Sequence, residues 1–136
     1  MASASSTIQR PLAVMMSRRI LSVAPSTPAV EAAQLMRDSR VGAVLVGEGT
    51  TFLGILTETD LVRKILAERR DVQQTLVSDV MMAPIITIEI DRSPHEASDL
   101  MAERGIRHLG ITENGRIVGV LSVRDLLRYF KNWGTL

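Results

Sequence analysis

The sequence predicts a mixed α/β (α+β) protein made of two tandem β-α-β-β-α repeats. One pattern occurs twice: Val14-Met15-Met16 returns as Val80-Met81-Met82, and Gly54-Ile55-Leu56-Thr57 returns as Gly119-Val120-Leu121-Ser122. The first pair lies 66 residues apart and the second 65, so we expect one extra residue near positions 29–31. Hydrophobic residues make up 46% of the chain and aromatic residues only 3%, which suits helices packed on buried strands of small aliphatic residues.

Each half opens with a short apolar strand, which we place at residues 20–23 and 85–88. A helix follows and begins near Pro28 or Pro94, because the missing N–H of proline costs nothing in the first helical turn. Apolar residues then recur at the spacing of one helix face. They are Val30, Ala33 and Met36 in the first half, and Ala97, Leu100 and Met101 in the second.

A hairpin and a last helix complete each half. The hairpin strands are expected at residues 43–46 and 52–56, and at residues 109–111 and 117–121. The turns Gly47-Glu48-Gly49 and Glu113-Asn114-Gly115 join them, and both are favourable turn sequences. The last helix begins at Thr57 or Ser122 and carries its apolar side chains on one face.

A repeat of roughly 50 residues is marginal for a core that folds alone. We therefore expect the two repeats to pack sheet to sheet, with pseudo-twofold symmetry, as one unit. The expected divisions are a flexible lead at 1–12, a first repeat at 13–66, a linker at 67–78, a second repeat at 79–130 and a tail at 131–136.

Composition excludes several classes of function. The net charge is +1, and Lys and Arg are spread along the chain, so no nucleic-acid partner is expected. No apolar run approaches the roughly 20 residues of a membrane helix, and the N-terminus lacks an apolar signal core, so no membrane partner and no secretion are expected. The chain has no cysteine, which fits a reducing cytoplasm.

The repeated segment places a hydroxyl and an acid where a strand meets a helix. Thr57 precedes Asp60 by three residues, and Ser122 precedes Asp125 in the same way. This spacing is that of a capping box, in which the two side chains satisfy the free N–H groups of the helix start. Capping is the simplest interpretation of either copy taken alone.

The same geometry also suits a ligand. A helix N-terminus attracts phosphate, a hydroxyl donates to a phosphate oxygen, and an ionised aspartate accepts from two adjacent ribose hydroxyls. Gly54 and Gly119, which precede the two hydroxyls, would let a ligand approach the backbone closely. Capping and ligand binding can coexist in one corner.

Taken together, these motifs resemble tandem cystathionine-β-synthase (CBS) domains. The resemblance rests on Gly-Ile-Leu-Thr-Glu-Thr-Asp and Gly-Val-Leu-Ser-Val-Arg-Asp at the end of each half, on Val-Met-Met before each first strand, and on Gly105-Ile106-Arg107-His108-Leu109. It covers about residues 13 to 130. One copy of the motif is weak, but two copies in the same order of elements are specific.

The resemblance implies clefts between the two repeats that bind AMP, ADP, ATP or S-adenosylmethionine as a regulatory ligand, with no cofactor required. Asp60 and Asp125 would hold ribose hydroxyls, Thr57 and Ser122 would lie by the phosphates, and Ile20 and Ile86 would flank the adenine. In the second half, Arg107 and His108 fall where the family often places phosphate-contacting basic residues. The matching Gly42-Ala43 supplies no cation, unless Arg18 or Arg19 reaches across, so we expect the second cleft to bind nucleotide better.

The function predicted from the sequence is that of a regulatory sensor without catalysis, read by an effector protein of unknown identity. The resemblance also implies a homodimer formed by the final helices, residues 58–66 and 123–130. The alternative is a ligand-free scaffold that only dimerises. We find no catalytic residue set and no metal site, because His95-Glu96-x-x-Asp99 lacks the second histidine of a zinc helix.

Overall fold

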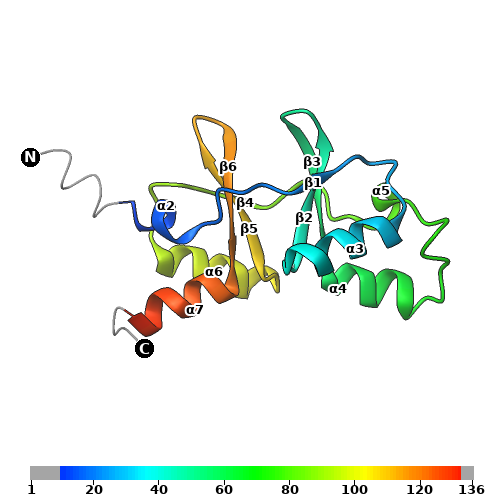
Figure 1. The fold of residues 1–136 in the computed structure, drawn as a ribbon. Helices are drawn as coiled ribbons and strands as arrows, with labels where there is room; N and C mark the ends of the chain where they lie inside the picture. Colours follow the sequence, from blue (N-terminus) through cyan, green and yellow to red (C-terminus); the bar gives the residue numbers. More distant parts are fainter. Residues whose placement is uncertain (1–9, 133–136) are drawn as a thin grey trace, which may run out of the picture. The chain divides into compact units, whose positions relative to one another are not determined.

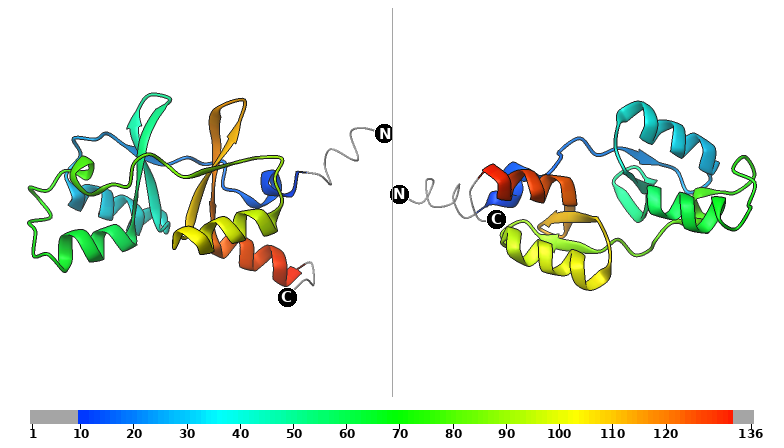
Figure 2. Two further views of the ribbon diagram at one scale, coloured as in Figure 1. Left: turned by 180° about the vertical axis from the view of Figure 1, so that it is seen from behind. Right: turned by 90° about the horizontal axis from the view of Figure 1, so that it is seen from below.

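The computed structural model describes residues 10–132, which form two compact units with one three-stranded sheet each (Figures 1 and 2). We call residues 21–85 the mid-chain unit. The split unit consists of residues 10–20 together with residues 86–132. In the described part of the chain, no helix has the length and apolar character needed to cross a membrane. The predicted α/β fold class is confirmed, whereas sheet-to-sheet packing stays a prediction.

The mid-chain unit contains a sheet of strand order β1-β2-β3, with β1 parallel to β2 and β2 antiparallel to β3. Its elements are β1 (Ser22–Val23), α3 (Ala29–Ser39), β2 (Ala43–Glu48), β3 (Thr51–Thr57), α4 (Glu58–Asp60), the π-helix η1 (Leu61–Leu66) and α5 (Val77–Val80). Helix α4 runs directly into η1, so residues 58–66 form one continuous helical segment. The predicted final helix is thus present, but most of it has the wider π geometry.

The split unit repeats this arrangement with strand order β4-β5-β6 and the same strand directions. Its elements are α2 (Pro11–Met15), β4 (Thr87–Glu89), α6 (Pro94–Arg104), β5 (His108–Glu113), β6 (Arg116–Ser122) and α7 (Val123–Asn132). The hairpin turn of Asn114 and Gly115 has positive φ at both residues, as its sequence predicts. In the other hairpin, Gly47 and Glu48 extend β2 and only Gly49 has positive φ.

Each unit has its own aliphatic core. The buried face of α3 carries Ala29, Ala32 and Met36, and that of α6 carries Pro94, Ala97 and Met101. These spacings of three and four residues mark one helix face, as predicted. The predicted face is slightly rotated, because Val30, Ala33 and Leu100 are only half-buried.

The two repeats match at a single offset of 65 residues, so the predicted insertion near positions 29–31 is wrong. Met16 and Met81 both cap the C-terminus of a short helix, and Arg40 and Gly105 both cap a long one. Pro28 is the N-cap of α3, and its structural match is therefore Ser93, the N-cap of α6, while Pro94 lies one position later. The identical Val-Met-Met triplets suggested an offset of 66 residues, but the structurally equivalent residues Met16 and Met81 lie 65 apart.

The two sequence repeats exchange their leading segments, so that the segment before each repeat packs in the other repeat's compact unit. Ser17 exchanges two backbone hydrogen bonds with Val120, at 2.9 and 3.0 Å, and Met82 exchanges two with Ile55, both at 2.9 Å. Figure 1 shows α2 beside β6 and α7, although α2 comes at the start of the chain. The segment that leads the first repeat therefore completes the second sheet, and the reverse holds for α5.

Helices α2 and α5 were not predicted from the sequence. Helix α2 begins in the expected lead and α5 in the expected linker, and each continues into the expected repeat that follows. Leu12 and Val77 are nevertheless fully buried, each with 0% exposure. The remaining linker is ordered against α3, since Ala29 donates to the Thr75 carbonyl at 2.8 Å and Val30 donates to the Val72 carbonyl at 3.0 Å. Residues 1–9 of the expected lead, and residues 133–136 of the expected tail, lie outside the described residues.

Candidate functional site

The corner between β3 and α4 is a closed capping box. The Thr57 hydroxyl oxygen accepts from the Asp60 backbone N–H at 3.2 Å, and the Asp60 carboxylate accepts from the Thr57 N–H at 3.0 Å. The Thr57 hydroxyl also donates to the same carboxylate oxygen at 3.1 Å. Capping is confirmed here, and it satisfies N–H groups that the helix start leaves without intrahelical partners.

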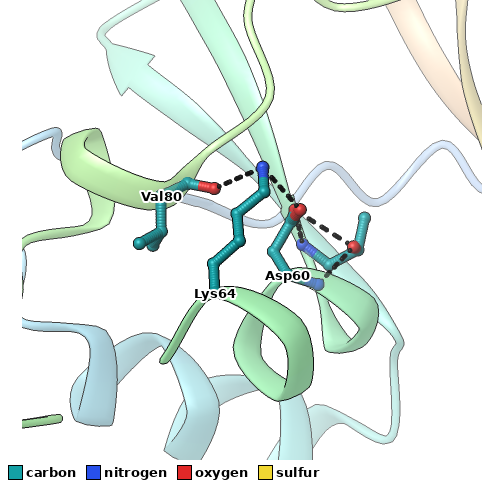
Figure 3. Close-up of polar contacts among 4 residues, drawn as sticks. Asp60, Lys64 and Val80 are labelled. Atoms are coloured by element: carbon teal, nitrogen blue, oxygen red, sulfur yellow. Dashed lines mark hydrogen bonds and ion pairs between the residues drawn. The ribbon is translucent and has the colours of Figure 1, made fainter. Parts of the chain in front are cut away.

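A lysine completes this corner, and the sequence analysis missed it. The Lys64 ammonium lies 3.0 Å from Oδ1 of Asp60 and donates to the Val80 carbonyl at 3.1 Å (Figure 3). Asp60 is buried, with 8% exposure, whereas the Lys64 side chain is 46% exposed. The signal in the sequence was the spacing of four residues between an acid and a base on one helix. The mid-chain corner therefore has a cation, although Gly42-Ala43 provides none.

The matching corner between β6 and α7 has the same cap but a different charge environment. The Ser122 N–H donates to the Asp125 carboxylate at 2.9 Å, and the Asp125 N–H donates to the Ser122 hydroxyl at 3.1 Å. Arg128 approaches Asp125 at 3.7 Å from an exposed position. Because Arg128 is exposed and the separation is long, this ion pair contributes little to stability. At the position matching Lys64 stands Tyr129, whose ring packs on Phe130.

The structure brings Arg107 and His108 to the Ser122 corner. His108 is paired with Ser122 across β5 and β6, and the Arg107 carbonyl accepts from the Val123 N–H at 2.9 Å. Arg107 is exposed and His108 is half-buried. The split unit thus places a hydroxyl and a carboxylate at the start of one ten-residue helix, whose first residue is bonded to the backbone of exposed Arg107.

Gly54 and Gly119 have a role within the fold, and their approach to a ligand stays a prediction. A Cβ on Gly54 would lie 2.7 Å from the Met82 carbonyl oxygen and 2.8 Å from the Met81 sulfur. A Cβ on Gly119 would lie 2.5 Å from the Met16 sulfur and 2.9 Å from the Ser17 carbonyl oxygen. The close backbone approach that we expected from a ligand is made by the chain itself, through the exchanged segments.

The sequence model of the CBS domain matches residues 12–67 and 77–132, which is most of the chain. This chain belongs to the CBS-domain family. A CBS pair indicates a regulatory or ligand-binding module.

Known CBS-domain proteins agree with this assignment. The chain is 36% identical over 111 residues to the CBS domain-containing protein YhcV of Bacillus subtilis, covering 82% of this chain and 79% of that one. It is 36% identical over 113 residues to an uncharacterized protein of Methanopyrus kandleri. That match covers 82% of this chain but only 58% of the Methanopyrus protein.

Two solved structures share the fold. A protein with CBS domains from Burkholderia ambifaria superimposes with a TM-score of 0.79 at 33% identity, covering 82% of each chain. A hexameric CBS-CP12 protein from bloom-forming cyanobacteria superimposes with a TM-score of 0.75 at 25% identity, covering 83% of this chain and 66% of that one.

The two isoleucines predicted to flank adenine do not occupy equivalent positions in the CBS pair. The Ile86 carbonyl accepts from the Gly110 N–H at 3.0 Å, and the matching bond in the other sheet runs from Leu45 to the Leu21 carbonyl at 2.9 Å. Leu21, not Ile20, is therefore the counterpart of Ile86. Ile20 is half-buried, and contact of either isoleucine with adenine stays a prediction.

The chemistry available at the two corners suits binding. Carboxylates and hydroxyls that cap a helix are acceptors and donors for the hydroxyl and phosphate groups of a ligand. Within residues 10–132, no group of three or more His, Cys, Asp or Glu side chains is arranged to hold a metal ion.

Proposed function

We propose that this chain is a regulatory module that binds AMP, ADP, ATP or a related adenosyl ligand such as S-adenosylmethionine. It carries out no reaction on that ligand. The observation that supports the proposal most is the split-unit corner, where Ser122 and Asp125 cap the start of α7 and the backbone carbonyl of exposed Arg107 accepts from its first residue. Membership of the CBS family supports the adenosyl part of the ligand.

In this proposal, the carboxylate of the corner binds the sugar of the ligand and the positive groups bind its phosphate. Asp125 accepts one short hydrogen bond, from Ser122, and its ion pair with Arg128 is long and exposed. A carboxylate offers about four acceptor positions, so acceptors remain for two ribose hydroxyls. Arg107 and the N-terminus of α7 provide positive charge for phosphate.

Sensing requires that the ligand prefer one conformation of the protein. A ligand that binds two conformations equally shifts no equilibrium, whatever its affinity. We propose that nucleotide binding selects one arrangement of the CBS pair, and that an effector protein recognises that arrangement.

A thermal-shift experiment tests the ligand. AMP, ATP and S-adenosylmethionine are added separately at millimolar concentration, and binding to the folded state raises the melting temperature by mass action. Asp125→Ala should abolish the part of the shift that arises at the split-unit corner. Arg107→Ala should weaken that part with AMP or ATP but leave the shift with adenosine, which is added as a ligand without phosphate. Absence of any shift with all of these ligands would contradict the proposal.

The matched control is Glu96→Ala. Glu96 closes the capping box of α6 in the same unit, where it accepts from the Ser93 N–H at 3.3 Å. This variant loses the same type of cap as Asp125→Ala, so it controls for the lower stability. It should keep the full ligand-induced shift.

We also propose that the chain forms homodimers through η1 and α7. The support is a matched pair of apolar side chains, Val62 and Leu127, each more than half exposed on these helices. Leu66 is exposed on the same segment as Val62. If dimerisation is the only role of these helices, the chain is a ligand-free scaffold, which is the alternative function.

Light scattering after size exclusion tests the dimer. The unaltered chain should elute with the mass of two chains, and Val62→Glu together with Leu127→Glu should yield a single folded chain. A monomer in the unaltered protein would contradict the dimer, and a dimer that binds no adenosyl ligand would favour the scaffold.

A further inference from the structure

We infer that Lys64 competes with a ligand for the Asp60 carboxylate. Ligand binding at Asp60 then requires Lys64 to leave the carboxylate and to release the Val80 carbonyl at the end of α5. This inference rests on the proposed ligand function and adds a regulatory contact to it. The observation is one ammonium group with two partners. Lys64 holds the Asp60 carboxylate at 3.0 Å and the Val80 carbonyl at 3.1 Å (Figure 3).

The Asp60 carboxylate is already well occupied. It accepts from the Thr57 N–H, from the Thr57 hydroxyl and from Lys64. About four acceptor positions exist on a carboxylate, so two further ribose hydroxyls cannot bind unless one partner leaves. The two Thr57 contacts belong to the cap that starts the helix, whereas Lys64 is half exposed on a flexible side chain. Lys64 is therefore the partner that a ligand would displace.

The second partner of Lys64 links this displacement to α5. Val80 is the last residue of α5, which is only four residues long. The N-terminal part of α5 keeps its own contacts, because Val77 donates to the Thr27 carbonyl at 2.8 Å and Ser78 donates to the Pro25 carbonyl at 3.1 Å. Release of Lys64 would thus loosen the C-terminal end of α5, which leads into Met81 and Met82.

The helix that carries Lys64 is itself unusual. Residues 61–66 form a π-helix, whereas α7 at the matching place in the split unit is a regular α-helix with Tyr129 in place of Lys64. π-Helical turns are rare and often lie at functional sites. Both the π-helix and the lysine are found in the corner where the carboxylate is occupied.

The coupling has to act in both directions. If a ligand at Asp60 weakens the attachment of α5, a firmly attached α5 weakens ligand binding by the same factor. The mid-chain corner is thus expected to bind nucleotide more weakly than the split-unit corner. Its occupation at high nucleotide concentration would change the segment that connects the two units in sequence.

The first test needs no ligand. Lys64→Met removes the ammonium but keeps the side-chain stem, and hydrogen exchange of the Met81 amide reports on the end of α5. Met81 donates to the Val77 carbonyl at 2.9 Å, and Met16 makes the matching bond to Leu12 at 2.9 Å in the split unit. Exchange at Met81 should accelerate about fivefold, the effect of losing one ordinary hydrogen bond, while Met16 stays unchanged. Equal exchange at Met81 in both proteins would overturn the inference.

The second test measures AMP binding calorimetrically in an Asp125→Ala background, where the mid-chain corner alone is intact. Lys64→Met should raise the AMP affinity about fivefold, and Arg63→Met, which removes a charge from the exposed neighbour, should not raise it. Unchanged or weaker binding in Lys64→Met would overturn the inference, because Lys64 would then assist the ligand. If AMP binds only in proteins with Asp125 intact, and Lys64→Met creates no second site, the inference fails while the proposed function stands. AMP binding at neither corner overturns both.

Discussion

The two corners share a motif and a cap, but they differ in the charges around the carboxylate. In the mid-chain unit, Asp60 is buried and held by Lys64 at 3.0 Å. In the split unit, exposed Arg128 lies 3.7 Å from the Asp125 carboxylate, and Arg107 directly precedes β5. A repeated motif therefore determines the backbone of a site, whereas residues outside the motif decide whether its acceptors are available to a ligand.

The largest expected effect tests which unit each exchanged segment stabilises. Leu12 is fully buried in the split-unit core, although it falls in the first CBS-domain match, residues 12–67. Leu12→Ala should lower the free energy of unfolding of the split unit by about 3 kcal/mol. Hydrogen exchange should then accelerate at Leu109 and Leu121 but not at Val44 and Leu56. The opposite pattern would contradict the exchange of segments.

The two glycines sharpen the comparison, because a methionine sulfur and a backbone oxygen oppose each of them at different distances. A Cβ on Gly54 would lie 2.7 Å from the Met82 oxygen, its nearest atom, whereas a Cβ on Gly119 would lie 2.9 Å from the Ser17 oxygen and 2.5 Å from the flexible Met16 sulfur. Gly54→Ala should cost about 2–3 kcal/mol and Gly119→Ala about 1–2 kcal/mol, because a side chain yields more easily than backbone. Urea unfolding measures both, and a larger loss for Gly119→Ala would contradict this ranking.

A smaller effect is expected at the ends of the long helices. Arg40 ends α3 with φ of 56°, and the matching Gly105 ends α6 with φ of 63°. Left-handed backbone is strained for a residue with a Cβ, so Arg40→Gly should stabilise the mid-chain unit by up to about 1 kcal/mol. Gly105→Ala should destabilise the split unit by a similar amount, as measured by urea unfolding. A destabilising Arg40→Gly would show that the arginine side chain outweighs the strain.

The smallest effect concerns an ion pair that only α3 has. The Arg37 side chain donates to Asp38 at 2.8 Å and holds the pKa of that carboxyl below its usual value, whereas α6 has Ala102-Glu103 at the matching positions. Because the folded pKa is the lower one, the contribution to stability is present above the unfolded pKa of about 3.9 and is lost as pH falls through the folded pKa. Both side chains are exposed, so the effect on stability is small. Titration of Asp38 by NMR should show the lowered pKa, and Arg37→Gln should restore it.

Much of the fold could be predicted from local patterns. The strands and long helices follow from apolar spacing, and the caps at Thr57 and Ser122 follow from the three-residue spacing to an acid. Helices α2 and α5 could not be predicted, because helices of five and four residues are stable only when packed against the rest of a protein. Their exchange between sheets leaves no local signal either.

The site was predicted less completely than the fold. Comparison of aligned repeat positions drew attention to Gly42-Ala43 and Arg107-His108, but Lys64 has no charged counterpart in the other repeat. Its importance depends on the π-helix and on the Val80 carbonyl, which the exchanged α5 brings to the corner. Gly54 and Gly119 were predicted to let a ligand approach closely, and the structure shows atoms of the chain itself close beside both.

The most direct measurement of the central claim is calorimetric titration of AMP into the unaltered chain, Asp60→Ala and Asp125→Ala. The account predicts that high-affinity binding survives in Asp60→Ala and disappears in Asp125→Ala. Binding that disappears in Asp60→Ala and survives in Asp125→Ala would contradict it.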